Sequence, residues 1–205
     1  MTVKTIARLA GVLMLSAGLA GCMDVTAEID VLSETTGKAT TTMTMGAEFY
    51  PMIKQMAEAG GEDAEASASS GFCEEEADVL TENADGSATC TSVKEGPLTE
   101  ITADEDSVSE DTVFTVVSPG VVRVAFKTSE MSSQVTEGQD EEGAQMMKAY
   151  FEGHNATIRI KGKKIIETNM DTAADGAAEK VIPFTALLDG TAELPDELYA
   201  VVDTR

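Results

Sequence analysis

Three cysteines are the residues of this 205-residue chain whose type and position suggest covalent chemistry. Cys22 directly follows an uncharged apolar run that ends in two small residues, as at a protease cleavage site, and its thiol is a nucleophile. Cys73 and Cys90 are an even pair, which predicts a disulfide in an oxidising compartment, with two free thiols as the alternative. A metal site at either residue is disfavoured because no second Cys or His is near it in sequence.

The first 21 residues have the organisation of a signal peptide. Lys4 and Arg8 supply positive charge, and the uncharged run Leu9–Ala20 is too short to span a bilayer, which takes about 20 apolar residues. The run ends at Leu19-Ala20-Gly21-Cys22, which resembles the lipobox of bacterial lipoproteins at all four positions. The resemblance implies that residues 1–21 are removed and that Cys22 receives a diacylglyceryl group on its sulfur and a further acyl chain, such as palmitate, on its amine.

Two or more acyl chains would anchor the protein stably, because each buried CH₂ contributes about 0.8 kcal/mol. The alternative is an ordinary secreted protein with a coincidental cysteine. A signal-anchor helix is disfavoured because the chain turns polar at Met23-Asp24.

The mature chain, residues 22–205, is strongly acidic. Cleavage removes Lys4 and Arg8 and no acid, so the formal charge of −23 becomes −25. This charge argues against nucleic-acid partners, which are bound through Lys and Arg, and against docking on anionic head groups. We therefore expect the N-terminal lipid to hold the protein to the membrane, while the acidic surface keeps the domain soluble.

Hydrophobic patterning predicts one α+β domain over residues 22–205, with antiparallel strands and two or three short helices. Apolar residues at helical spacing over Phe49–Ala57 predict an amphipathic helix, and Met146–Phe151 suggests a second short one. A further helix is possible over Cys73–Leu80. Alternation and turn residues predict three hairpins: Val25–Val31 with Ala39–Met45, Val113–Val117 with Val121–Lys127 (a buried hairpin), and Thr157–Lys161 with Lys164–Thr168 across Gly162-Lys163. Further β segments are expected at Ala88–Lys94, Leu98–Ala103, Val181–Leu187 and Leu198–Val202.

The order of these elements resembles the LppM-type lipoprotein domain over most of Asp24–Val202. The shared features are a strand directly after the lipidated cysteine, its Gly37-containing hairpin, a helix, and a late hairpin that leads through Glu167-Thr168-Asn169 into a final strand. The resemblance implies a β-rich envelope domain that handles lipids or glycolipids. Members of this family end in a membrane helix, whereas no apolar run precedes the last residues of this chain, Asp203-Thr204-Arg205. Because of this difference, no binding residue is carried over from the family.

Catalytic and metal-binding motifs are missing from the sequence. His154, the single histidine, stands between Gly153 and Asn155, and we expect it in a solvent-exposed turn rather than in a catalytic pocket. The sequence has no G-x-S-x-G, H-E-x-x-H or phosphate-loop motif, and its two candidate calcium loops lack the essential acids. The expectation is a non-enzymatic protein without catalytic residue, metal or cofactor.

Three functions remain open at this point. In the first, the domain binds a lipid or other apolar ligand in a cavity lined by methionines (Met43, Met45, Met52, Met56, Met146 and Met147). In the second, it is a structural or adaptor lipoprotein that presents its acidic surface to an envelope protein. The third, a hydrolase with an unfamiliar site, is the least supported.

Met23 rather than an acid directly follows Cys22, which favours the periplasmic face of the outer membrane over the inner membrane.

Substitution of the predicted lipid acceptor tests this assignment. Cys22→Ser removes the thiol that accepts the lipid, so we expect an unprocessed and unlipidated precursor. Intact-protein mass spectrometry distinguishes the precursor from the mature wild type. A wild-type N-terminus other than a lipidated Cys22 would contradict the assignment.

Overall fold

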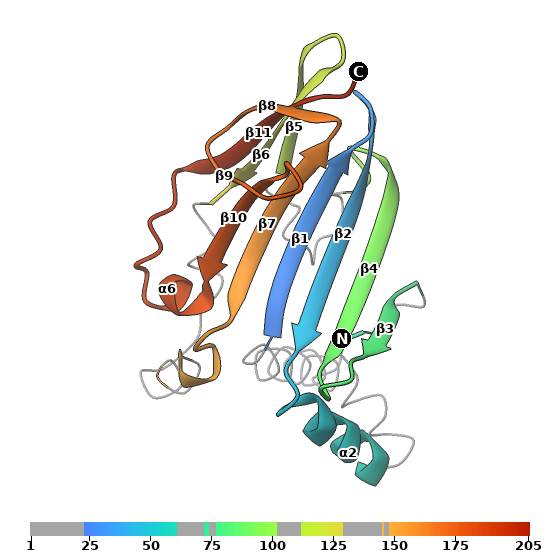
Figure 1. Ribbon diagram of the computed structural model, residues 1–205, viewed down its shortest axis with the longest axis vertical. Helices are drawn as coiled ribbons and strands as arrows, with labels where there is room; N and C mark the ends of the chain where they lie inside the picture. The colour runs from blue at the N-terminus through green and yellow to red at the C-terminus, as the bar shows by residue number, and fades with distance from the viewer. Residues whose placement is uncertain (1–22, 61–71, 74–76, 102–111, 129–144, 146–147) are drawn as a thin grey trace, which may run out of the picture.

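The computed structural model describes residues 23–60, 72–73, 77–101, 112–128, 145 and 148–205 (Figure 1). The lipobox and Cys22 lie outside these residues, as do Met146, Met147 and the side chain of Met56. In the part of the chain that is described, strands predominate and helices are short. No helix there is long and apolar enough to cross a membrane.

The larger of two sheets has seven strands in the order β3-β4-β2-β1-β7-β10-β9. Its strands are antiparallel with one exception, because β1 and β7 run parallel at the centre of the sheet. The expected antiparallel pairing therefore holds for most of the sheet and fails at this pair, so the sheet is mixed. The strands are β1 (Met23–Val31), β2 (Thr36–Met45), β3 (Val79–Glu82), β4 (Ala88–Pro97), β7 (Asn155–Gly162), β9 (Asp171–Thr172) and β10 (Ala178–Pro183).

The smaller sheet is antiparallel throughout, in the order β5-β6-β11-β8. It packs against the part of the larger sheet that contains β1, β7 and β10. Its strands are β5 (Thr112–Ser118), β6 (Val121–Lys127), β8 (Lys164–Thr168) and β11 (Glu197–Asp203).

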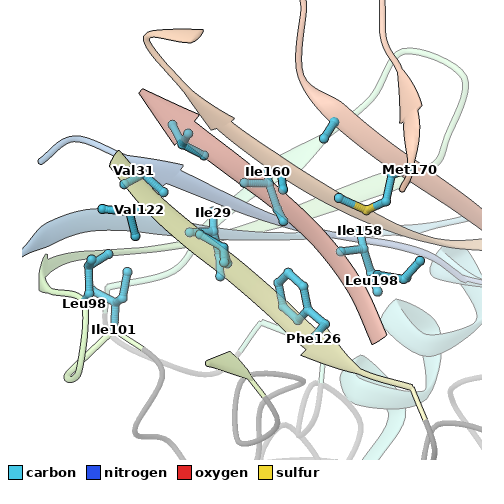
Figure 2. Close-up of a cluster of buried hydrophobic side chains, with 14 of the residues drawn as sticks. Ile29, Val31, Leu98, Ile101, Val122, Phe126, Ile158, Ile160, Met170 and Leu198 are labelled. Atoms are coloured by element: carbon cyan, nitrogen blue, oxygen red, sulfur yellow. The ribbon is translucent and has the colours of Figure 1, made fainter. Parts of the chain in front are cut away.

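The main core fills the space between the two sheets. Figure 2 shows Ile29, Ile158 and Ile160 of the large sheet in the same cluster as Phe126 and Leu198 of the small sheet. Each of these side chains is at most 4% exposed. In β1, β7 and β11, residues that face this core alternate with residues that face outward, as the period of two in their sequences requires.

The first hairpin forms as predicted. Its strands β1 and β2 pair antiparallel from Met23 opposite Met45 to Val31 opposite Gly37. At the turn, the Ser33 hydroxyl accepts hydrogen bonds from the backbone N–H groups of Thr35 and Thr36, which fixes the tight reversal. The β5–β6 hairpin also forms, with Gly120 at φ +75° in its turn. It is buried mainly on β6: on β5, Phe114 packs against the main core, but Val116 and Val117 are 51% and 57% exposed.

The hairpin predicted across Gly162-Lys163 is wrong, although both strands are present. β7 belongs to the large sheet, whereas β8 pairs with β11 in the small sheet, so the chain passes from one layer to the other at this point. A Cβ on Gly162 would lie 2.2 Å from Val202 Cγ1, so the close approach of the layers requires glycine there. The two-residue connection resembles a hairpin turn in sequence because both structures need a small, flexible residue.

Other elements of the structure differ from the prediction in type or in extent. The predicted helix over Phe49–Ala57 is present as α2 (Tyr50–Gly60), and residues 148–150 are helical as expected. Val79 and Leu80 lie in β3 instead of a helix, and residues 98–101 form a turn instead of a strand. The segment Val181–Leu187 divides into the end of β10 and the helix α6 (Phe184–Leu188), whose Leu187 reaches the main core.

The layer crossing yields a test of the fold. We expect Gly162→Ala to lower the free energy of unfolding by about 1–3 kcal/mol, because the added methyl group overlaps Val202 and packed cores resist such insertion. Gly96→Ala in β4 is the matched control, since its Cβ would meet only Ile101 Cγ2 at an ordinary 3.9 Å. Urea unfolding of both variants measures the difference. Equal stabilities would contradict a close crossing at Gly162.

Candidate functional site

The residue directly after Cys22 is already part of the fold. Met23 opens β1 and is 9% exposed. It lies in a second apolar cluster with Met45, Ile53, Phe72, Ala88 and Cys90, separate from the main core. We call this part of the molecule the α2 end: the start of β1, the end of β2, α2 and residues 148–154, at the bottom of Figure 1.

Helix α2 packs against the second cluster through Ile53. Pro51 is tolerated in its first turn, where a backbone N–H would have no helical partner. Ile53 faces the cluster and is 7% exposed, whereas the neighbouring Met52 is 49% exposed. Phe49, just before the helix, meets Tyr150 edge to face with ring centroids 5.9 Å apart. The helix therefore buries the side chain of Ile53 against the domain and leaves the apolar side chain of Met52 exposed to solvent.

Polar contacts tie α2 to β3. The Tyr50 hydroxyl donates a hydrogen bond to Glu82 at 2.8 Å, and Lys54 Nζ lies 2.7 Å from the same carboxylate. The hydrogen bonds from Lys54 and Tyr50 lower the pKa of Glu82, while partial burial and the carboxylate raise the pKa of Tyr50. These groups are largely exposed, so they orient the helix more than they stabilise it.

The disulfide expected between Cys73 and Cys90 is present in the structure. It joins the segment before β3 to Cys90, a fully buried residue of β4, with the two Cα atoms 5.5 Å apart. Asp78 lies beside it, and ligand atoms of the three residues come within 4.8 Å of one another. This group does not offer thiolate ligands to a metal ion, because both sulfurs are used in the disulfide.

His154 differs from its expected setting in an open turn. It directly precedes β7, its side chain is 25% exposed, and Nδ1 lies 3.3 Å from Asp24 Oδ2. The other oxygen of Asp24 accepts a hydrogen bond from the Asn155 backbone N–H at 2.8 Å. The pair sits where the parallel strands β1 and β7 begin side by side, so Asp24 connects the two strands. Sequence reasoning missed this contact because 129 residues separate the two partners.

The described methionines do not line a common cavity. Met45 is 1% exposed and packed in the second cluster, Met43 packs against that cluster, and Met52 is on the outside of α2. A shallow hollow of about 290 Å³ lies elsewhere, between β10 and the loop after α6. Its apolar lining comes from Val181, Ile182, Pro183, Ala186, Ala192 and Leu194. A second hollow of about 340 Å³, at the β7–β8 crossing, is lined largely by charged residues, including Lys161, Lys163 and Asp175.

An ionic cluster covers the outer face of the large sheet, and sequence reasoning did not foresee it. Arg159 on β7 pairs with Glu28 at 2.9 Å, with Asp175 at 2.6 Å and with Glu179. Burial alone would lower the pKa of Arg159, but these three carboxylates raise it above its ordinary value. Glu28 and Asp175 also hold Lys161 and raise its pKa. With each of these charges paired, the cluster connects β1, β7 and β10.

Comparison with known proteins finds a structural similarity and no match to a family model or a curated protein. No protein-family model matches the chain, and no curated protein matches it. Among solved structures, the chain is similar to the NMR structure of the folded domain of the Mycobacterium tuberculosis LppM protein. The match covers 89% of this chain and 93% of that chain, at 10% sequence identity and a TM-score of 0.42. It is the same lipoprotein domain that the order of sequence elements resembles.

The disulfide yields a stability test. Reduction of the wild type should lower its free energy of unfolding by about 3 kcal/mol, the entropic value for a loop of this length, without abolishing the fold. The control is Cys73→Ala/Cys90→Ala, whose stability should not respond to reductant. Unfolding curves with and without dithiothreitol give both values. If both thiols of protein made in an oxidising compartment react with an alkylating agent, the pairing is wrong.

Proposed function

We propose that this protein is a lipid-anchored bacterial envelope lipoprotein, attached through Cys22, whose domain works by binding rather than by catalysis. The observation that carries the proposal is that Met23, the residue directly after Cys22, is 9% exposed and packed in the second apolar cluster. An ordered domain therefore follows directly after the proposed lipid-acceptor cysteine. The Cys73–Cys90 disulfide supports export to an oxidising compartment.

We assign the apolar ligand to the hollow between β10 and the loop after α6, and not to the methionine-lined cavity expected from the sequence. The hollow between β10 and α6 supports the assignment, because most of its lining is aliphatic and it is partly enclosed by two elements. Its volume of about 290 Å³ is close to the lower limit for small-molecule sites, so it suits part of an acyl chain or a similarly small apolar group. Lys180 and Glu193 at its border would contact a polar head group.

The alternative is an adaptor role toward an envelope protein. The formal charge of −25 after cleavage supports an electrostatic partner surface. β5 supports it further as an edge strand of the small sheet, with Val113, Val116 and Val117 between 46% and 57% exposed. Exposed edge strands of this kind accept an extended segment of another protein as an additional strand.

One preparation tests anchoring, membrane and binding together. The native protein is isolated from inner- and outer-membrane fractions of its own host after a sucrose gradient, and the domain is then studied by native mass spectrometry. We expect it in the outer-membrane fraction, with a co-purifying mass in the range of a lipid or other small apolar molecule.

The alternative outcomes separate the parts of the proposal. A co-purifying protein would favour the adaptor role over the apolar ligand. Recovery with the inner membrane would overturn the outer-membrane assignment, and recovery in the soluble fraction would overturn anchoring itself. Val181→Asp places a charge on the rim of the hollow at a residue that is 47% exposed, so it should remove a bound apolar ligand without loss of fold.

A further inference from the structure

We propose that the α2 end rests on the bilayer that holds the Cys22 lipid, with Met52 and Tyr150 in the membrane interface. The inference rests on the proposed lipidation of Cys22. It adds an orientation of the domain and a second, protein-borne membrane contact.

The first argument is the length of chain between lipid and fold. Consecutive Cα atoms are about 4 Å apart, and Met23, the residue after Cys22, is already fixed in β1 and packed in the second cluster. A flexible linker between them is therefore excluded. The start of β1 must lie near the head groups, and the end of the molecule around it must face the membrane.

The second argument is the chemistry of the surface at that end. Met52 and Tyr150 are 49% and 46% exposed, and the half-buried rings of Phe49 and Tyr50 lie next to them. Tyrosine is enriched at membrane interfaces because its ring is apolar and its hydroxyl reaches water. Phe151, which follows Tyr150, is 2% exposed and packs on Phe184 at 4.7 Å, so Tyr150 is held on an ordered part of the chain.

The third argument concerns charge, since an acidic domain is repelled by anionic lipid. Near the α2 end, Lys54 pairs with Glu82 and Lys148 pairs with Asp189 at 2.5 Å, whereas Glu48 and Glu152 are exposed and have no ion-pair partner among the described residues. These pairs reduce the local negative field. The contact itself is made by uncharged side chains, so it does not depend on attraction to head groups.

The experiment uses tryptophan as a depth probe, because the chain contains none. Full-length lipidated Met52→Trp protein is placed in phosphatidylcholine vesicles with or without brominated acyl chains, which quench nearby tryptophan. Leu32→Trp is the matched control: Leu32 is 46% exposed, similar to Met52, but follows the far end of β1, roughly 30 Å from Met23.

We expect brominated lipid to reduce the Met52→Trp emission by roughly two-fold or more and to leave Leu32→Trp unchanged, because interfacial tryptophan lies close to the acyl chains. Tyr150→Trp is a second reporter and should behave like Met52→Trp. Circular dichroism checks that each variant keeps the wild-type fold.

Each of the other outcomes contradicts either the orientation or the proposed function. If the protein floats with the vesicles but both reporters at the α2 end are unquenched, the orientation is wrong while anchoring stands. Equal quenching of Met52→Trp and Leu32→Trp would mean that the domain lies on its side, which also overturns the orientation. If the protein does not float and mass spectrometry finds no lipid on Cys22, the proposed function fails, and the orientation fails with it.

Discussion

The parallel pairing of β1 with β7 is the contact on which the rest of the structure depends. It joins the first strand of the domain to a strand about 130 residues later and places Ile29 beside Ile160, at the centre of the main core. On the outer face the same register brings Glu28 opposite Arg159, so one pairing organises both the apolar core and the ionic cluster. Partial burial strengthens these ion pairs relative to fully exposed ones, which suits a strand pair that must hold distant segments together.

This central pair also determines where the two ends of the molecule lie. β1 and β7 both start at the α2 end, where Asp24 contacts His154 and Asn155, and both lead toward the layer crossing at Gly162. Met23 and the crossing are therefore at opposite ends of the same strands. The N-terminal end of the described chain is thus part of a central strand of the large sheet.

Several sequence-based expectations failed for a common reason. Alternation of apolar residues identifies strands and their buried faces, but it carries no information about partners in another layer. Lys164–Thr168 was correctly identified as a strand, yet it pairs with β11 instead of β7. Val116 and Val117 are apolar enough for a core, yet they lie on an edge strand of the small sheet. The methionines expected around one cavity are divided between a packed cluster and the surface.

By itself, the sequence determined the chemical features of this protein: the lipobox-like segment Leu19-Ala20-Gly21-Cys22, the pair Cys73 and Cys90, a formal charge of −23, and a β-rich α+β domain with an amphipathic helix. These features are local or compositional, so spacing and residue type are enough to recognise them. Only the tertiary structure decided that β1 and β7 are parallel, that Arg159 pairs with three acids, and that Met23 is packed in the second cluster. These depend on contacts between segments far apart in sequence, whose pairing follows from how two sheets can bury their apolar faces together.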